Sequence, residues 1–546
     1  MSGVAAGSAG DKPAGGGAGD AASDAAWKPK GNPWLIAVVV TLAAFMEILD
    51  TTIVNVSLPH IAGSVSASYD DATWTLTSYL VANGIVLTIS GFIGRVIGRK
   101  RYFLICIAMF TVCSFLCGTA TSLPQLVVYR LFQGLFGGGL QPNQQSIILD
   151  TFPPAKRSQA FSVVAIAVIF APAIGPTLGG WLTDNYSWRW VFLINIPVGL
   201  LAFFAVTALV EDPPWVCRQK ARIGDTDWTG LALITLGLGS LQVMMDRGED
   251  SDWFSSGFIR IMAGLAAIGI AGAIVWLTTT KKPIVNLNVF RDRNFAVGSV
   301  IIFCLGAVLY SGTVLIPQLA QERLGYTAML AGMLLSPGAL VLVVMVPIIG
   351  RVILPRVQAR YVIATGFFVI GCAFAASHSL TPDISFDRLT MLRIFQIAGL
   401  GFLFVPNSTI SYATLPKELN NDASALYVML RNVAGSLGIS IATATVTQRM
   451  QIRRAYLADH LSPLNQNYDQ LLARTTQALQ NLGHGAAAAR AAANGLINQT
   501  LNGQAAILAY TDVFAYVAIA AFCVVPIAFL FKSTKVKPGG GDAPAH

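Results

Sequence analysis

Two carboxylates, Glu47 and Asp50, interrupt an apolar run that begins at Trp34. They are three residues apart, so on a helix both side chains point to the same face. A charged carboxylate in the middle of a bilayer costs about 2.5–3.5 kcal/mol on insertion scales, so it faces protein rather than lipid and marks function. Burial and a neighbouring like charge both favour the neutral carboxyl, which suits the pair to taking up and releasing protons. The alternative is a static ion pair with a neighbouring helix.

Arg130 is the expected partner of Asp50. Both residues lie about 9–12 Å from the outer ends of their predicted spans, 124–148 and 34–58, by the 1.5 Å rise of a helix. A paired guanidinium favours the ionised carboxyl, and separation of the two groups lets the carboxyl take up a proton. Protonation is thereby coupled to helix movement. A purely structural pair is the alternative. Arg431, inside the predicted span 423–446, needs a partner or an aqueous cavity.

A further set of residues, some polar and some aromatic, lies within the predicted membrane segments and provides candidates for the lining of a substrate cavity. A mostly apolar pocket with a few polar groups suits amphipathic, drug-like substrates. The candidates for the substrate cavity are Phe45, Asn83, Phe132, Gln133, Gln141, Tyr310, Gln318 and Arg431.

Composition identifies the elements that must position these residues. Hydrophobic residues make up 54% of the 546 residues and charged residues 12%, about half the charged share of an ordinary soluble protein. Runs of about 20 apolar residues, each long enough to cross a bilayer, recur along the chain. We therefore predict an all-α, polytopic membrane protein with fourteen spans, at 34–58, 74–94, 102–121, 124–148, 160–182, 190–210, 228–245, 258–279, 295–318, 328–349, 361–378, 389–412, 423–446 and 508–531.

The charge pattern predicts the orientation. The formal charge of +9 comes from short basic clusters between apolar runs, which indicates a topology signal rather than a nucleic-acid site. Alternating the loops from a cytoplasmic start places these clusters inside, so both termini are expected in the cytoplasm, with 1–31 as a disordered tail and 533–546 as the second tail. The basic loop 447–507 falls outside. It is expected to form one or two amphipathic helices on or above the outer surface, with a disordered insert as the alternative. The clusters are Arg95, Arg99, Lys100 and Arg101; Lys156 and Arg157; Arg218, Lys220 and Arg222; and Lys281, Lys282, Arg291 and Arg293.

No motif predicts an enzyme, a cofactor or a metal. Six of the seven cysteines fall in apolar runs and the seventh, Cys217, lies in a basic loop, without Cys-His metal spacing. The chain contains neither GxxxxGK[ST] nor HExxH. Energy for any transport must come from an ion gradient or from the gradient of the substrate.

An internal repeat divides the chain. FIGRVI at 92–97 recurs as IIGRVI at 348–353, and RLFQG at 130–134 recurs as RIFQI at 393–397, at offsets of 256 and 263 residues. Two duplicated halves with a site at their interface are typical of secondary transporters. We expect six-helix halves at 32–212 and 286–532, separated by two extra spans within 213–285 that contribute little to the central cavity.

Five motifs in order resemble the major facilitator superfamily, and specifically its fourteen-span drug:proton antiporter branch of the EmrB/QacA type. The resemblance implies that Asp50 and Arg130 take part in proton coupling. It also implies that the element with Gly175, Pro176, Gly179 and Gly180, known in the family as the antiporter motif, seals the two halves. The motifs are LDTTIVNVSLP at 49–59, GFIGRVIGRKR at 91–101, LVVYRLFQG at 126–134, APAIGPTLGG at 171–180 and WRWVFLINIPVG at 188–199.

The loop with Gly91, Arg95 and Arg99 departs from the superfamily pattern. The family usually carries an aspartate where Arg95 stands, so its acid-base latch between the halves is not expected here in the usual form. Arg99 and the basic residues after it are then expected either to gate or to anchor the loop to anionic headgroups.

The resulting hypothesis is a proton-coupled multidrug exporter of a bacterial inner membrane. The outer loop and the EmrB-type resemblance imply a tripartite system with a periplasmic EmrA-like adaptor and a TolC-type outer-membrane channel. Two alternatives stay open: an exporter of one dedicated metabolite, such as a siderophore or a lipid precursor, and a membrane scaffold without transport.

Overall fold

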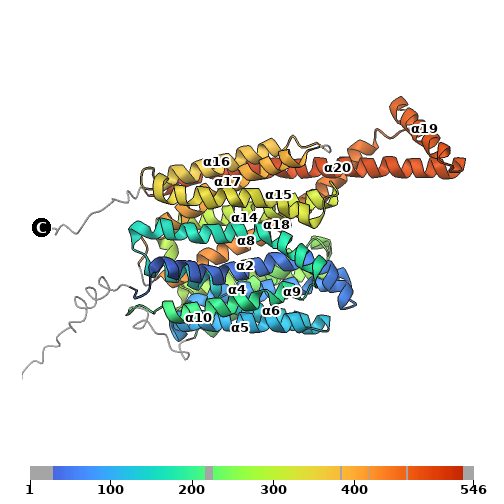
Figure 1. The fold of residues 1–546 in the computed structure, drawn as a ribbon. Coiled ribbons are helices and arrows are strands. Elements are labelled where there is room, and N and C mark those ends of the chain that lie inside the picture. The colour runs from blue at the N-terminus through green and yellow to red at the C-terminus, as the bar shows by residue number, and fades with distance from the viewer. Residues whose placement is uncertain (1–28, 215–225, 382–383, 417–418, 463–464, 533–546) are drawn as a thin grey trace, which may run out of the picture.

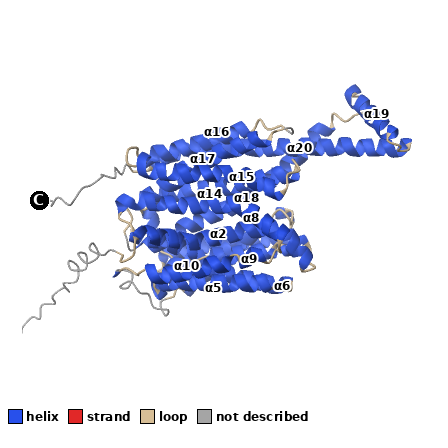
Figure 2. Cartoon of the chain, in the orientation of Figure 1, coloured by secondary structure: helices blue, strands red, loops and turns tan. Residues whose placement is uncertain are grey.

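The computed structural model describes residues 29–214, 226–381, 384–416, 419–462 and 465–532. All regular elements in these ranges are helices (Figures 1 and 2). Most of both predicted tails and the basic cluster around Cys217 and Arg218 lie outside the described residues.

The helices follow the predicted order in two groups separated by a pair. The first group is α2 (Pro33–Ser64), the short α3 (Tyr69–Ala72), α4 (Trp74–Ile97), α5 (Arg99–Thr119), α6 (Leu123–Gly137), α7 (Leu140–Thr151), α8 (Arg157–Asn185), α9 (Trp190–Leu193) and α10 (Asn195–Leu209). The pair is α12 (Trp228–Arg247) and α13 (Gly257–Thr279). The second group is α14 (Arg293–Glu322), α15 (Ala328–Ile348), α16 (Ala359–Ser377), α17 (Phe386–Ser411), α18 (Asn420–Ala458), α19 (Gln466–Asn481) and α20 (Ala486–Val524).

Fourteen helical paths cross the bundle. Twelve helices in the described part of the chain are long and apolar enough to span a membrane, and α8, bent by 43° near Pro172, makes a thirteenth. The fourteenth path is α6 followed by α7. Its second part carries Gln141, Asn143, Gln144 and Gln145, which are all buried. Polar side chains at membrane depth are tolerated because they face protein rather than lipid, so this span is polar where it crosses the centre of the bundle.

Local sequence sets several helix ends. Asn32 caps α2 by accepting a hydrogen bond from the backbone of Trp34, and Pro33 occupies the first turn, where no backbone donor is needed. Asp292 caps α14 in the same way. Gly98, between α4 and α5, has a φ of +97°, a backbone conformation that side chains disfavour. The glycine therefore allows the tight turn between these two spans.

The two groups stand side by side as halves of one bundle (Figure 1). Within the halves, α2 packs on α8, α4 on α6, α14 on α18 and α16 on α17. Between the halves, α8 packs on α15 and α4 on α18, while α12 packs on both α4 and α18. The described chain begins and ends at the same end of the bundle, which we call the N/C face, and the opposite end is the loop face.

The segment 447–507 extends the bundle instead of lying across it. Helices α18 and α20 are 39 residues each, so both continue past the bundle at the loop face, and α19 folds back on α20 (Figure 1). Leu472 of α19 packs on Ala493 and Ile497 of α20. Arg453 and Asp512 form a two-bonded ion pair, at 2.9 and 2.6 Å, that joins α18 to α20. We call residues 447–507 the outer hairpin. Most of its length is thus a direct continuation of two membrane helices.

Candidate functional site

A partly open cavity lies between the two halves, in a region with about 1070 Å³ of empty space that includes its opening to solvent. It occupies the middle of the bundle and the half next to the loop face. Its lining residues are Glu47, Ile48, Thr51, Thr52 and Asn55 of α2; Leu76, Tyr79, Leu80, Asn83, Gly84 and Leu87 of α4; Arg130, Gln141, Pro172 and Gln242 of α6, α7, α8 and α12; Tyr310, Thr313 and Val314 of α14; and Met429, Asn432, Val433, Gly435, Ser436 and Ile439 of α18.

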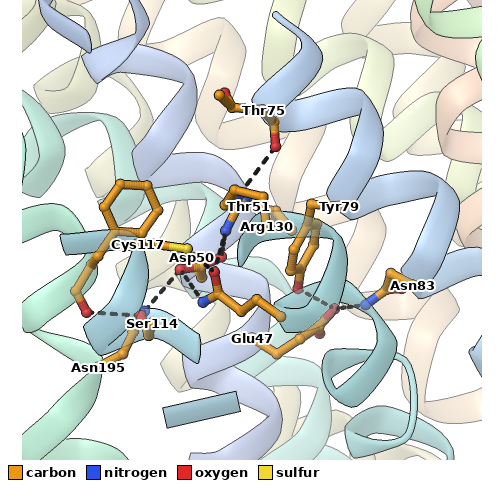
Figure 3. Close-up of polar contacts among 12 residues, drawn as sticks. Glu47, Asp50, Thr51, Thr75, Tyr79, Asn83, Ser114, Cys117, Arg130 and Asn195 are labelled. Carbon is orange, nitrogen blue, oxygen red and sulfur yellow. Dashed lines mark hydrogen bonds and ion pairs between the residues drawn. The ribbon is translucent and has the colours of Figure 1, made fainter. Parts of the chain in front are cut away.

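Asp50 and Arg130 meet, as predicted, and Arg130 lines the cavity while Asp50 lies behind it. Arg130 Nη1 lies 2.6 Å from Asp50 Oδ2, and both side chains are fully buried. Asp50 Oδ1 accepts further hydrogen bonds from Gln133 at 3.1 Å and from Asn195 at 2.8 Å (Figure 3). Arg130 Nε donates to the carbonyl oxygen of Thr75 at 3.2 Å. Every one of these contacts lies within the first half.

Glu47 belongs to a separate network, although it lies one turn from Asp50. Its carboxylate accepts hydrogen bonds from Asn83 at 3.0 Å and from Tyr79 at 3.4 Å, both on α4 (Figure 3). It also accepts a short hydrogen bond from Gln141 Nε2. Gln141 Oε1 in turn accepts one from Arg431 Nη2 of α18. A carboxylate of the first half is therefore linked through one amide to a guanidinium of the second half.

The predicted cavity residues divide into two groups. Asn83, Gln141 and Tyr310 line the cavity, and Arg431 is fully buried behind its wall, against Gln141. The prediction is wrong for Phe132, which is 46% exposed on the outside of the bundle. Phe132 is two positions from Arg130, and residues two apart on a helix do not face the same side. The remaining three residues do not line the cavity either. Phe45 packs against the hydrophobic core, and Gln133 donates a hydrogen bond to Asp50. Gln318 is partly buried.

Of the two extra helices, α12 contributes one residue, Gln242, to the lining of the cavity, and α13 contributes none, in line with the small contribution expected from the sequence. Gln242 of α12 lines it and donates a hydrogen bond to Ser436 of α18 at 3.0 Å. Arg247, at the end of α12, donates to Thr73 beside α4 at 2.5 Å. Helix α12 thus bridges α4 and α18 in the loop-face half of the bundle. The sequence position of α12 between the repeats did not reveal this, because a helix outside the duplication can still pack between its products.

The N/C face is closed by contacts between the halves. Arg95 Nη1 lies 2.5 Å from Asp422 Oδ1 at the start of α18. Next to it, a side chain on Gly91 would lie 2.7 Å from Asp422, so the glycine permits this close approach. The acid-base latch that the sequence did not lead us to expect is therefore present, with the arginine on α4 and the acid on α18. Arg99 pairs with buried Asp150 rather than facing lipid headgroups.

The glycine motif of α8 packs inward within its own half. Added side chains would collide with Thr52 at Gly175 and with Ile53 at Gly179, so both glycines let α2 approach α8 closely. Pro176 lies within the helix and Gly180 is buried. Contact with the other half comes from the next face, where Thr177 lies against Gly332 of α15. Within the motif, Thr177 thus contacts the other half, whereas Gly175 and Gly179 contact α2 of their own half.

Sequence reasoning missed two carboxylates and an amide of the site. Asp422 and Asp150 lie next to loops, where acidic residues are common, so nothing marked them as partners of Arg95 and Arg99. Asn195 interrupts the apolar run of α10 and contacts Asp50. A buried amide in an apolar span is expensive without a partner, which is the signal that could have identified Asn195.

Comparison with known proteins agrees with the fold. The sequence profile of the Major Facilitator Superfamily matches residues 40–439. The multidrug export protein EmrB of Escherichia coli (strain K12) is 35% identical over 513 residues, covering 94% of this chain and 98% of that protein. The fatty acid resistance protein FarB of Neisseria gonorrhoeae is 34% identical, covering 92% of this chain and 96% of that protein. The crystal structure of the human organic anion transporter MFSD10 shares the fold, with a TM-score of 0.54 at 14% identity, and covers 90% of this chain and 100% of that chain.

Proposed function

The chain belongs to the major facilitator superfamily, and we propose that it exports amphipathic, drug-like compounds across a bacterial inner membrane in exchange for protons. The observation that carries the proposal is the buried Asp50–Arg130 pair at the wall of a cavity shared by both halves. The similarity to relatives named multidrug export proteins supports the export of such compounds.

The pair provides a physical route for coupling. A paired guanidinium favours the ionised Asp50, whereas separation of the two groups in a buried site favours its protonation. Both groups sit on helices that line the cavity. A substrate that binds there and protonation of Asp50 therefore favour different positions of these helices. Alternating exposure of the cavity to the two sides then exchanges substrate for protons.

The direction of transport follows from the proposed orientation. The basic clusters at the N/C face, including Arg95 and Arg101, fit the positive-inside rule, so this face is cytoplasmic and both termini are inside. The Arg95–Asp422 latch closes the cytoplasmic side, and the cavity lies toward the outside. This arrangement is the outward-facing state of an exporter, in which substrate leaves and a proton enters.

The test uses everted membrane vesicles that are acidified inside by respiration. Wild-type protein should drive uptake of a fluorescent amphipathic dye, and Asp50→Asn should reduce this uptake at least tenfold, because the amide keeps the volume of the side chain but cannot titrate. Asp184→Asn, at an exposed position of α8, is the matched control and should transport normally. Full proton-driven uptake by Asp50→Asn, at equal protein in the membrane, would remove the basis of the proposal.

We extend the proposal to a tripartite assembly in which the outer hairpin contacts a periplasmic EmrA-like adaptor that leads to a TolC-type channel. The hairpin projects past the loop face and exposes large apolar side chains. Exposed apolar surface of this kind favours coverage by a partner. The side chains are Tyr456 (66% exposed), Leu471 (51%), Leu482 (78%) and Leu496 (47%).

A further inference from the structure

The second half contains a counterpart of the Asp50–Arg130 site. Arg393 stands 263 residues after Arg130, and Thr313 stands 263 residues after Asp50. The structure brings these counterparts together, since Arg393 Nη2 donates a hydrogen bond to Thr313 Oγ1 at 3.1 Å. In the second half the arginine is thus present, and a neutral hydroxyl contacts it where the first half has an aspartate.

The surroundings of the two arginines match as well. Gln133 accepts a hydrogen bond from Arg130 at 2.9 Å, and Gln396, at the same offset, accepts one from Arg393 at 3.2 Å. The amide of Gln396 also donates to Ser377 at 3.2 Å. The two sites thus share an arginine and a glutamine at the same offset, and they differ in charge balance and in the partner of the arginine Nε.

In the part of the chain that the structure describes, Arg393 has no counter-charge. The side chain is 4% exposed, and no carboxylate of the described residues pairs with it. Its two hydrogen-bond acceptors are the neutral side chains of Gln396 and Thr313, and its Nε has no partner among the described residues. A buried guanidinium without an anion is costly, and in a membrane segment arginine is normally paired or exposed to an aqueous cavity.

The unbalanced guanidinium lies next to the cavity. Thr313, which it contacts, lines the cavity wall. A Cβ on the neighbouring Gly312 would lie 3.0 Å from Arg393 Nη1, so the absence of a side chain leaves the guanidinium close to the open backbone of α14. Thr313 both lines the cavity and accepts the hydrogen bond of Arg393, so an anion that binds the guanidinium from the cavity takes the place of this hydroxyl as its acceptor.

We propose that Arg393 and Thr313 form an anion site at the cavity wall of the second half, which takes a monovalent anionic group. The group is either a halide ion or the carboxylate of a transported compound, and it occupies the place that Asp50 holds beside Arg130. The halide source is independent of the function proposed above, whereas the carboxylate source rests on it. The first half then carries a built-in carboxylate beside its arginine, and the second half carries an exchangeable anion.

The test measures thermal unfolding of the purified transporter in sodium chloride and in sodium sulfate at equal ionic strength, with sodium butyrate as the carboxylate probe. Wild-type protein should show a midpoint that rises with chloride or butyrate and then saturates, since a ligand that binds only the folded state stabilises it. Thr313→Asp supplies a fixed carboxylate beside Arg393 and should abolish this response while keeping the arginine in place. Arg393→Gln should also abolish it. Arg388→Gln, at an exposed position of the same helix, should respond as wild type.

The outcomes separate the sources of the anion. A response to chloride alone identifies an inorganic ion site, and a response to butyrate that competes with chloride identifies a carboxylate site. An identical midpoint in all three salts, or a Thr313→Asp protein that responds as wild type does, overturns the proposal. Asp50→Asn should keep the anion response even though it loses proton-driven uptake, so failure of the transport proposal is distinguishable from failure of this one.

Discussion

Glu47 and Asp50 lie on the same helix but connect to different parts of the molecule. Asp50 contacts Arg130, Gln133 and Asn195, which all belong to the first half. Glu47 reaches Arg431 of the second half through Gln141. Protonation of Asp50 therefore acts first on packing within one half, whereas a change of charge at Glu47 acts directly on the contact between the halves.

Arg130→Lys tests whether the cavity wall needs a guanidinium or only a positive charge. Arg130 bonds Asp50 and the Thr75 carbonyl with different nitrogens and lies 4.1 Å from the ring of Tyr79. An ammonium cannot reproduce this planar set of contacts, so we expect dye uptake in everted vesicles to fall at least tenfold. Uptake equal to wild type at equal expression would show that a point charge is sufficient.

Glu47→Gln should weaken transport by less than Asp50→Asn does. The carboxylate accepts three hydrogen bonds, from Tyr79, Asn83 and Gln141. In the glutamine variant the NH2 group, which is itself a donor, would face at least one of these donors. One unsatisfied buried group costs about 1–3 kcal/mol, so a lower unfolding midpoint is expected together with a several-fold loss of uptake. If the two variants lose transport equally, the two carboxylates act as one coupled pair.

At the scale of elements, α12 packs on the two halves through one face of the helix, which carries polar contacts. Gln242 contacts Ser436, and the hydroxyl of Ser440 donates to the carbonyl oxygen of Met245 at 2.9 Å. Helix α12 therefore spans the gap between α4 and α18 on the loop-face side, where the cavity lies. Movement of the halves must carry α12 with one of them or break these contacts.

Deletion of residues 460–495, with a short Gly-Ser linker, tests the outer hairpin. The deletion removes α19 and the first turns of α20, but it keeps the Arg453–Asp512 ion pair and the Arg454–Asn502 hydrogen bond that hold the two spans together. We expect loss of adaptor co-purification with dye uptake in isolated vesicles preserved. Retained adaptor binding with loss of vesicle uptake would instead assign the hairpin to gating of the outer mouth.

For the whole molecule, the latch at the N/C face decides which side of the cavity is closed. Arg95 and Asp422 belong to different halves, and the Asp422 side chain is 4% exposed. Further contacts between the halves lie near the same face, including the hydrogen bond from Tyr412 to Gln145 at 3.1 Å. Rocking of the halves must break this set of contacts together, so their strength sets the population of the state that is open at the N/C face.

Asp422→Asn should shift that population. Breaking a buried ion pair by removing one partner costs about 3–5 kcal/mol, which is enough to make a minor state dominant. Spin labels at the exposed positions Arg101 and Arg356, one on each half, should report a longer distance in the variant. Asp387→Asn, at an exposed site near the loop face, is the control. An unchanged distance distribution would show that the latch does not hold the closed state.

The sequence by itself determined the fourteen helical paths, their order and the duplication, because each span is a local property of about 20 apolar residues that must satisfy their own backbone hydrogen bonds. It also identified Asp50 and Arg130, since ionised groups in apolar runs have few inexpensive arrangements. Their meeting followed from depth along two helices, which depends only on helical rise.

Tertiary structure alone decided which faces meet. The outward position of Phe132, the entry of Gln242 into the cavity and the pairing of Arg95 with Asp422 all depend on the rotation of helices about their axes and on contacts between residues far apart in the chain. A run that is apolar on nearly every face carries little information about that rotation, because lipid and protein interior are equally apolar. For the same reason the sequence did not indicate that Arg393 contacts a neutral group. The structure shows this, because Thr313 contacts Arg393 where the first half has an aspartate.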